Sequence, residues 1–433
     1  DRTRIPPKRG HLRTKRFMSE TLNQFCQRSL DAVQLEGLKR QLRLIESPQS
    51  SVVQINGREY QNFSSNDYLG LANHPGIKEK ALQTMETFGT GAGASPLISG
   101  FQTPLNELQM ALADLKGAES ALVFHSGYCT AVGTIPALFG PTDILIIDKL
   151  CHASLIDGAR RSGAKLRVFR HNDTVDLEKK LKWAASQSTT PGTKDGNHIG
   201  IIAESVYSMD GDHAPLKQMA ALKHAYGAWL MIDEAHSTGL FGKHGGGLIQ
   251  EQGLSGQVDI QMGTLGKALG CSGGFIAGSK LLVDFLINKA RSFIYSTAPS
   301  PMVSAAALAS LHITTSEEGD HLRKTLFDRI QTFHEAVGDP WRNPNGGTAP
   351  GLHQTAGLTS PILPWWVGDA EKAVRLSQAL MDRGLFVPAI RYPTVPPNTS
   401  RLRITLSASH SSAAIENLVK QLVHCHEQLN PCS

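Results

Sequence analysis

The sequence contains no apolar run of the roughly 18 residues that a membrane-spanning helix needs, and its N-terminus lacks the apolar block of a secretory signal. Its six cysteines include no CxxC pair, and we expect no metal site. Internal repeats and low-complexity tracts are also missing. These absences predict an ordinary globular protein with reduced, mostly structural cysteines, which suits a cytosol-like compartment.

Positive charge is concentrated at one end of the chain. The formal net charge is +5, but residues 1–17 contain seven lysines and arginines against one acid. Removing this +6 leaves the remaining residues at −1, so the body of the protein shows no basic surface for nucleic acid. We expect residues 1–18 to be a flexible basic extension before a functional start near Met18, and a cytoplasmic location. An organellar leader is the alternative.

Short apolar runs that end in polar or glycine-bearing turns alternate with helix-like segments. The runs cover residues 121–128, 144–152, 199–205, 229–236, 258–267 and 273–279. Helix-like segments between them include residues 104–117 and 215–227. This alternation predicts an α/β fold with a mostly parallel central sheet and helices on both faces. In such sheets the ligand binds beyond the carboxyl ends of the strands.

Smaller parts surround this predicted core. Residues 19–50 indicate an amphipathic helical arm that a small strand pair follows, and the C-terminal region ends with a strand at 402–410 and an amphipathic helix. Surface loops are expected at 188–197 and 343–351. The predicted divisions are a basic extension (1–18), an arm with a strand pair (19–62), a large domain (63–315) and a smaller α+β domain (316–433).

The stretch MGTLGKALG, residues 262–270, sets Lys267 among glycine, alanine and leucine with no acidic neighbour. Burial disfavours the charged form of an amine, so a lysine without a partner in a dry site loses its proton easily. A neutral amine can then form an imine with a carbonyl compound. The alternative is a lysine that extends from a helix start to solvent, so the surrounding residues must decide.

Polar residues at the ends of other predicted strands supply this context. Asp233 ends an apolar strand, where a carboxylate would keep the pyridine nitrogen of pyridoxal phosphate protonated and make the ring an electron sink. His236 could hydrogen-bond the ring's phenolic oxygen or Asp233, and His152 could stack on the ring. The segment HSGY (125–128) offers backbone amides at a helix start, which suit a phosphate. A helix cap at Asp233, structural histidines and a tight turn at HSGY are the alternatives.

These segments occur in the order found in a known family. The chain resembles the α-oxoamine synthases, which are fold-type-I pyridoxal phosphate enzymes that join an amino acid to an acyl thioester and release carbon dioxide. The resemblance extends from about residue 30 to the C-terminus. The motifs that carry it are NFSSNDYLGLANHP (62–75), GTGAGASPLISG (89–100), DKLCHASLIDGARRSGA (148–164), ESVYSMDGD (204–212), DEAHSTG (233–239), TLGKALG (264–270), IYSTAP (294–299), AIRYPTVP (389–396) and RLRITLSASH (401–410).

The resemblance assigns roles to residues of this chain. Lys267 would hold the cofactor covalently and then remove the Cα proton of the amino acid. Asp233 would pair with the pyridinium and His152 would stack on the ring, so these three are the expected catalytic residues. The expected cofactor contacts are Ser126, Gly127, Tyr128, His152, Glu204, Ser208, Asp233, His236, Thr264, Lys267, Ser296 and Thr297. The expected substrate contacts are Arg40, Asn66, His152, Arg391, Thr394 and Arg403, of which Arg403 would grip the amino acid carboxylate.

The resemblance also implies partners and substrates. In this family the segment with Ser296 and Thr297 approaches the phosphate bound by the partner subunit, so a homodimer with shared sites is expected. Within the family, the chain is most similar to members that condense L-alanine with pimeloyl-CoA or a pimeloyl carrier protein in biotin biosynthesis. Members that use glycine or serine with another acyl-CoA share the same core and are the alternative.

Four positions depart from the usual pattern of the family. Leu105 and Gln109 stand where relatives commonly carry histidine and glutamate. Gly246 replaces a frequent arginine, and His125 precedes Ser126 where an apolar or small residue is usual. None of these changes removes the cofactor machinery, but residues at the acyl tunnel or the dimer contact select the acyl substrate.

Three other interpretations fit the sequence less well. The stretch GTGAGAS (89–95) resembles a dinucleotide fingerprint but follows a helix-like segment instead of a strand. The stretch GCSGG (270–274) satisfies the GxSxG hydrolase pattern with Ser272 as nucleophile, yet it precedes a strand, whereas a nucleophile elbow follows one. A cofactor-less scaffold subunit would have lost the imine-forming lysine, which this chain retains as Lys267.

Overall fold

The computed structural model describes residues 20–187, 197–337 and 360–429. The predicted basic extension (1–18) and the two predicted surface loops (188–197 and 343–351) lie outside these residues, except for Asn197. The chain divides into two compact units, one ending at Leu44 and one beginning at Ile45. In the described ranges no helix is both long and apolar enough to cross a membrane.

The N-terminal unit contains helix α1 (Leu22–Leu35). Thr21 begins it with a capping box, because its hydroxyl accepts a hydrogen bond from the Gln24 amide while the Gln24 side chain accepts one from the Thr21 amide. The predicted helical arm over residues 19–50 is wrong beyond this helix. Gly37 adopts a left-handed φ of 66°, which ends a helix and which few other residues adopt easily.

The strand pair predicted after the arm is confirmed as an antiparallel hairpin of β1 (Val52–Ile55) and β2 (Arg58–Asn62). Asn56 and Gly57 form its turn with φ values of 51° and 70°. Two successive positive φ angles define the type I′ turn that matches the twist of a hairpin, and Asn-Gly is the sequence that favours it. A short parallel strand, β11 (Leu385–Phe386), joins β2 from far along the chain.

The central sheet has seven strands in the order β3-β9-β8-β7-β6-β4-β5. Its strands are β3 (Ser120–Phe124), β4 (Ile144–Asp148), β5 (Lys165–Phe169), β6 (Ile199–Glu204), β7 (Trp229–Asp233), β8 (Ile260–Thr264) and β9 (Gly274–Gly278). Strand β9 runs antiparallel to both of its neighbours, and the other pairings are parallel. The mostly parallel sheet is therefore confirmed, and β5, at its edge, is a strand that was not predicted.

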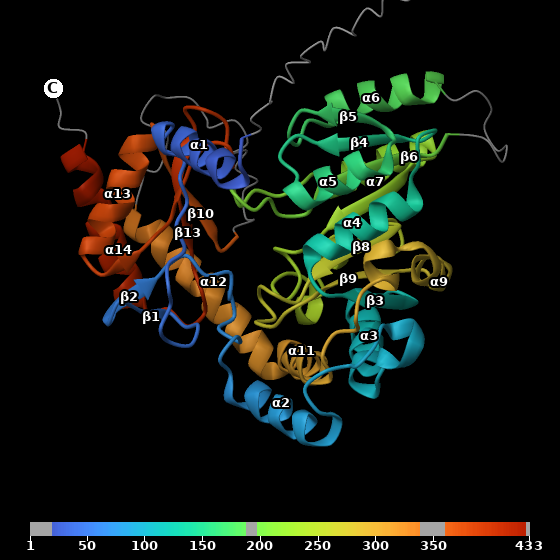
Figure 1. The fold of residues 1–433 in the computed structure, drawn as a ribbon, viewed down its shortest axis with the longest axis horizontal. Helices are drawn as coiled ribbons and strands as arrows, with labels where there is room; N and C mark the ends of the chain where they lie inside the picture. The colour runs from blue at the N-terminus through green and yellow to red at the C-terminus, as the bar shows by residue number, and fades with distance from the viewer. Residues whose placement is uncertain (1–19, 188–196, 338–359, 430–433) are drawn as a thin grey trace, which may run out of the picture. The chain divides into compact units, whose positions relative to one another are not determined.

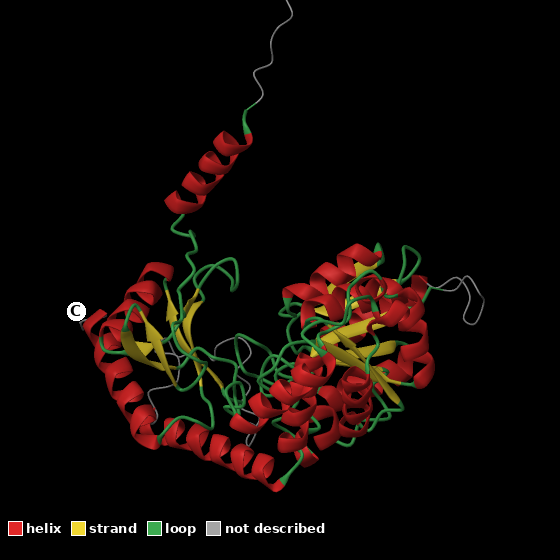
Figure 2. Cartoon of the chain, turned by 60° about the horizontal axis from the view of Figure 1, so that its bottom comes forward, coloured by secondary structure: helices red, strands yellow, loops and turns green. Residues whose placement is uncertain are grey.

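Helices cover both faces of this sheet, as Figure 1 and Figure 2 show. Successive residues of a strand point to opposite faces. Accordingly, Ile144 and Ile146 of β4 belong to one hydrophobic core, and Leu145 and Ile147 belong to another. The first core includes residues of α6 (Thr174–Gln187) and α7 (Leu216–Tyr226), and the second includes residues of α4 (Gly127–Leu138), α5 (Ala153–Ser162) and α9 (Lys280–Lys289).

A third hydrophobic core lies beside β3 and β9 and includes residues of α3 (Thr103–Lys116) and α11 (Pro301–Thr314). The helices predicted at 104–117 and 215–227 are thus confirmed as α3 and α7. The other elements of this part are α2 (Pro75–Phe88), the π-helix η1 (Pro96–Gly100), the 3-10 helix η2 (Lys243–Gly245), α8 (Leu248–Glu251) and α10 (Arg291–Ile294).

The C-terminal region has its own antiparallel sheet in the order β10-β13-β12. Its elements are α12 (Glu317–Val337), β10 (Ile362–Gly368), α13 (Ala370–Asp382), β12 (Ala389–Ile390), β13 (Ser400–Thr405) and α14 (Ser412–Leu429). The strand and final helix predicted from the sequence are confirmed here as β13 and α14. The predicted domain boundaries at residues 62/63 and 315/316 stay predictions.

Candidate active site

Lys267 lies in the connection from β8 to β9, just beyond the carboxyl end of β8. Its side chain is half-buried, and Nζ lies 2.7 Å from Nε2 of His236. Burial lowers the pKa of Lys267 to about 8, although the nearby carboxylates Asp233 and Glu204 act in the opposite direction. The amine therefore loses its proton far more easily than an exposed lysine does.

Two buried carboxylates end neighbouring strands of the central sheet. Glu204 ends β6 and Asp233 ends β7, and the two residues are register partners in the parallel pair. Burial raises the pKa of both carboxyl groups, and the charge of Asp233 raises that of Glu204 further. Backbone amides hold them in place, because Ala235 donates to Asp233 Oδ1 at 2.9 Å and His152 donates to Glu204 Oε1. A cationic ligand group at this edge would stabilise both carboxylates in the ionised form.

His236 connects Lys267 with a buried tyrosine. The Tyr68 hydroxyl lies 2.6 Å from His236 Nδ1 and 3.2 Å from Oδ1 of Asn66. Burial lowers the pKa of His236 well below its ordinary value, and the charges of Lys267 and Arg403 add to this effect. The ring is therefore neutral, with one donor and one acceptor nitrogen. It can pass a hydrogen bond between the tyrosine hydroxyl and the lysine amine.

His152 stands at the carboxyl end of β4, immediately before α5. Its Nδ1 accepts a hydrogen bond from the Ser154 amide at 3.2 Å and lies 2.8 Å from the Ser154 hydroxyl. The side chain thus caps the helix, which restricts the orientation of the ring.

The N-terminus of α4 lies at the same edge of the sheet. Ser126 caps it by accepting a hydrogen bond from the Cys129 amide at 3.1 Å. A Cβ atom at Gly274 would come within 2.7 Å of Gly127, so the first turn of the helix packs directly against the backbone of β9. The first amides of a helix have no partner inside it, and they attract phosphate groups. Thr264 lies nearby, with its hydroxyl donating to the carbonyl of Gly273 at 2.9 Å.

Arg403 brings a strand of the C-terminal sheet into this cluster. Its guanidinium donates from Nε to the carbonyl of Ser208 at 2.6 Å and from an Nη nitrogen to the Thr405 hydroxyl at 3.0 Å. The residue is buried, and its positive charge adds to the effect of burial in lowering the pKa of Lys267. Burial raises the pKa of Tyr68 to about 12, and Arg403 acts in the opposite direction. An arginine that is buried with few carboxylates around it attracts an anionic group of a ligand.

The structure places the remaining predicted residues as follows. The hydroxyl of Tyr128, an exposed residue, donates to Asp157 Oδ2 at 2.9 Å. Ser296 and Thr297 follow α10, and the Thr297 carbonyl contacts the ring of His125. Arg391 and Thr394 lie between β12 and β13, with the Thr394 amide donating to the Arg391 carbonyl at 3.0 Å. Arg40 is exposed in the N-terminal unit. The binding roles of these residues stay predictions.

A second buried lysine, which was not predicted from the sequence, lies beside the site. Lys116, at the end of α3, is fully buried, forms an ion pair with Glu234 and donates to the Gly246 carbonyl at 2.6 Å. Glu234 also accepts hydrogen bonds from the Ser237 hydroxyl and the Ile249 amide at 2.9 and 3.0 Å. This network fixes the segment that carries Asp233 and His236. No pattern near Lys116 indicates its burial, because its partner is 118 positions away.

Tyr68 was also not predicted, although its position two residues after Asn66, in the motif NFSSNDYLGLANHP, was a usable signal.

The four departures from the family pattern have structural roles where their contacts are known. Leu105 is a core residue, and the Gln109 side chain accepts a hydrogen bond from the Val123 amide at 3.0 Å. In the described part of the chain, no cluster of histidine, cysteine and acidic side chains could hold a metal ion.

Comparisons with known proteins agree with this geometry. The family model described as aminotransferase class I and II matches residues 58–422. The 8-amino-7-oxononanoate synthase of Geotalea daltonii is 42% identical over 400 residues, which cover 92% of this chain and 97% of that protein. The enzyme of the same name from Pseudomonas putida (strain W619) is 42% identical over 393 residues, covering 90% and 95% of the two chains.

Solved structures give the same picture. Serine palmitoyltransferase from S. paucimobilis with a bound PLP-myriocin aldimine matches with a TM-score of 0.83 and 28% identity, covering 94% of this chain and 98% of that chain. The 8-amino-7-oxononanoate synthase of Francisella tularensis matches with a TM-score of 0.67 and 26% identity, covering 84% and 96% of the two chains. The chain belongs to the class I and II aminotransferase family of pyridoxal phosphate enzymes and, within it, to the α-oxoamine synthases.

Proposed function

We propose that this protein condenses L-alanine with a pimeloyl thioester to give 8-amino-7-oxononanoate, carbon dioxide and the free thiol, a step of biotin biosynthesis. The observation that carries the proposal is Lys267, an amine of lowered pKa that faces His236 at 2.7 Å beside the buried carboxylate of Asp233. The 42% identity to 8-amino-7-oxononanoate synthases supports this choice of reaction within the family.

The residues of the site fit pyridoxal phosphate. An imine needs a neutral amine, and a pKa near 8 makes this form far more available at Lys267 than at an exposed lysine. Asp233, whose pKa burial raises, is a carboxylate suited to hold a protonated pyridine nitrogen. The N-terminus of α4 and Thr264 would hold the phosphate, and Ser208 and His236 would lie near the phenolic oxygen. When bound, the cofactor withdraws the electron pair that the departing proton leaves at Cα.

Lys267 would hold the cofactor covalently until the amino group of alanine replaced it. The freed amine of Lys267 would then take the Cα proton of alanine. A positioned base of this kind contributes about 10²–10⁴-fold to the rate. The neutral ring of His236 and the Tyr68 hydroxyl hold the amine in place by a chain of hydrogen bonds. His152 would lie against the face of the bound ring, at an angle set by its capping contact with Ser154.

Arg403 would bind the carboxylate of the amino acid, with Asn66 nearby. Its guanidinium is already oriented by the Ser208 carbonyl and the Thr405 hydroxyl, so binding needs little reorganisation of the side chain. Arg391, Thr394 and Arg40 are the proposed contacts to the acyl substrate.

The cofactor is tested by absorption spectroscopy. Protein supplied with pyridoxal phosphate should turn yellow, and borohydride reduction should fix the cofactor to Lys267, as peptide mass spectrometry would show. A colourless protein would contradict the proposal and favour a cofactor-less scaffold.

Substrate choice is tested by carbon dioxide release from alanine, glycine and serine with a panel of acyl-CoAs and pimeloyl carrier protein.

A second activity in the same family is favoured by one observation. The serine palmitoyltransferase structure matches with a TM-score of 0.83, against 0.67 for the 8-amino-7-oxononanoate synthase structure. The higher identity to the 8-amino-7-oxononanoate synthases outweighs this difference, because the two enzymes share one fold and the acyl substrate is selected by individual side chains. Turnover of serine with a long-chain acyl-CoA and not of alanine with pimeloyl-CoA would reverse the choice.

A homodimer is supported by an exposed apolar surface formed by Leu97, Ile98, Phe101 and Tyr295, which are 49%, 80%, 47% and 71% exposed. The amide of Ala298 donates to the carbonyl of Ala94 at 2.9 Å, which holds the two segments of this surface together. A second copy would cover these side chains and bring Ser296 and Thr297 to the interface. Exposed apolar side chains that are grouped in this way mark contact surfaces between proteins.

The dimer is tested by analytical ultracentrifugation. The wild type should sediment as a dimer, and the double substitution Ile98→Asp with Tyr295→Asp should shift it toward the monomer. A monomeric wild type at micromolar concentration would contradict a shared site.

A further inference from the structure

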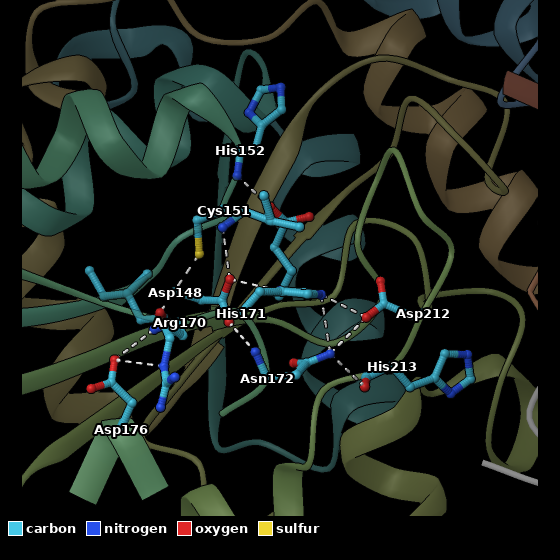
Figure 3. Close-up of polar contacts among 12 residues, drawn as sticks. Asp148, Cys151, His152, Arg170, His171, Asn172, Asp176, Asp212 and His213 are labelled. Carbon is cyan, nitrogen blue, oxygen red and sulfur yellow. Dashed lines mark hydrogen bonds and ion pairs between the residues drawn. The ribbon is translucent and has the colours of Figure 1, made fainter. Parts of the chain in front are cut away.

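A buried ion cluster lies next to the candidate site, and Figure 3 shows its members. It consists of Asp148, which ends β4, His171, which follows β5, and Asp212, which follows β6; we call these three residues the clamp. His171 Nδ1 lies 2.9 Å from Asp148 Oδ1, and its Nε2 lies 2.7 Å from Asp212 Oδ2. The three side chains are only 0–10% exposed.

The clamp holds its imidazole in the charged form. Each ring nitrogen faces a carboxylate oxygen, which can only accept, so the ring donates twice and is an imidazolium. Burial alone would lower the pKa of His171, but the hydrogen bonds to Asp148 and Asp212 raise it to about 10. The ring of Tyr207 meets the imidazole edge-on, with 4.3 Å between centroids. Charge-assisted bonds at both ends fix the histidine strongly.

One end of the clamp secures the start of the loop that leads to His152. Asp148 accepts a hydrogen bond from the Leu150 amide at 2.8 Å and another from the Asn172 amide at 2.9 Å. The loops after β4 and β5 are therefore joined through one carboxylate.

The other end secures a tight turn after β6. The Tyr207 amide donates to the Asp212 carbonyl at 3.0 Å, and the Gly211 amide donates to the Tyr207 carbonyl at 2.9 Å, so residues 207–212 form a closed turn. Asn172 adds a hydrogen bond from Nδ2 to Asp212 Oδ2 at 2.7 Å. The Asp212 side chain is thus held by both His171 and Asn172.

The opposite side of this turn faces the arginines of β13. The Ser208 carbonyl accepts from Arg403 Nε at 2.6 Å, and Asp210 pairs with Arg401. Gly211 has no space for a side chain, since a Cβ atom there would lie 2.2 Å from the Ile362 carbonyl oxygen. The turn is therefore held between the clamp and the C-terminal sheet, and any shift of it moves the acceptor that orients Arg403.

We propose that His171 is a positioning residue for the amino acid substrate, because it fixes through Asp212 the turn that orients Arg403. His171 touches neither substrate nor cofactor in this scheme. The inference rests on the proposed function for one assignment only, that of Arg403 to the amino acid carboxylate.

The test compares wild-type holoprotein with His171→Ala and Asp212→Asn. In both variants the dissociation constant of L-alanine should rise about tenfold, the size of effect expected when a hydrogen bond to a charged group, here the Arg403 guanidinium, is lost. This constant is measured from the change in cofactor absorbance without any acyl substrate. Hydrogen–deuterium exchange of the amides in residues 207–212 should accelerate in both variants. The control is His198→Ala, which removes a ring stacked 4.4 Å from Trp229 and should change neither quantity.

A folded, cofactor-loaded variant with alanine affinity within twofold of wild type and unchanged exchange would overturn the inference. If His171→Ala does not fold, Asp212→Asn decides by the same two criteria. Failure of the proposed function looks different. Wild-type holoprotein would then give no spectral response to alanine, glycine or serine, while the exchange rates of residues 207–212 still report whether the clamp holds the turn.

Discussion

Lys116 and Lys267 are both withdrawn from solvent, but their surroundings differ. Lys116 is fully buried, paired with Glu234 and bonded to the Gly246 carbonyl at 2.6 Å. Lys267 faces the neutral ring of His236 at 2.7 Å, and no carboxylate in the described part of the chain forms an ion pair with it. The first lysine cross-links α3 to the segment after β7, whereas the second presents an amine that loses its proton readily.

The difference shows that burial alone does not make a lysine reactive. A buried amine that is paired with a carboxylate at hydrogen-bond distance has a structural role. Removing either partner would leave a buried charge without compensation and destabilise the fold. At Lys267 the carboxylates of Asp233 and Glu204 act only through space, and the pKa falls to about 8. Lys116 therefore stabilises the segment that carries Asp233 and His236, which lie next to Lys267.

The largest effect should come from Lys267→Ala. We expect kcat for carbon dioxide release to fall at least about 10³-fold, because the variant loses the base as well as the point of covalent attachment. The thermal midpoint of the apoprotein should not fall, since the substitution removes an amine that burial disfavours. Lys280→Ala, at an exposed lysine paired with Asp284, is the control and should leave both quantities unchanged. If Lys267→Ala and Lys280→Ala had comparable kcat values, Lys267 would have no special role in the reaction.

Lys116→Met should act on stability instead. Removing one partner of a buried ion pair costs about 3–5 kcal/mol, so we expect the free energy of unfolding in urea to fall by this amount. The double variant Lys116→Met with Glu234→Leu should recover part of the loss, since no charge is then left without a partner. A single variant as stable as the wild type would show that this ion pair does not support the fold.

Two adjacent carboxylates offer a finer comparison. Asp233→Asn should lower kcat about 10²–10³-fold, the effect of removing one preorganised electrostatic contact, with little change in unfolding free energy. Glu234→Gln should lower the unfolding free energy with little change in kcat, because Glu234 binds Lys116, Ser237 and the Ile249 amide. Both variants are measured for kcat and for urea unfolding. If both variants changed kcat and the unfolding free energy alike, Asp233 and Glu234 would not have separate roles.

The smallest expected effect is the pH dependence of stability. The unfolded chain binds the proton of Lys267 up to its ordinary pKa of 10.5, whereas the folded apoprotein releases it near pH 8. The unfolded state thus holds more protons between these values, so stability should rise with pH across this window. The gain should be on the order of 1–3 kcal/mol, and Lys267→Met should abolish it. A wild-type-minus-variant difference that stays flat from pH 8 to 10.5 would contradict the lowered pKa.

The sequence predicted those parts of the fold that depend on local pattern. Buried strands such as β4 and β7 contain continuous apolar runs, and the polar residues at their ends placed His152 and Asp233 at the same edge of the sheet. Strand β5 was missed because three of its five residues are exposed, so its sequence lacks an apolar run. The helix of the arm ends at Leu35, earlier than predicted, because Gly37 adopts a left-handed φ.

Contacts between distant residues were beyond sequence reasoning. Nothing in the sequence near His171 indicates that it lies between Asp148 and Asp212, 23 and 41 positions away. The same is true of Arg401 and Asp210, which are separated by 191 positions. Such pairs depend on which strands become neighbours, and a single sequence without relatives does not contain that information.

The reversed direction of β9 has a consequence for how Lys267 is anchored. Because β8 and β9 are antiparallel neighbours, the nine residues between Thr264 and Gly274 return directly without a crossover helix. The Leu265 amide donates to the Gly273 carbonyl at 3.0 Å and the Cys271 amide to the Leu265 carbonyl at 2.8 Å, so the two ends of the loop are joined to each other next to the sheet. Lengthening this connection by a single residue would therefore displace the amine of Lys267 from His236.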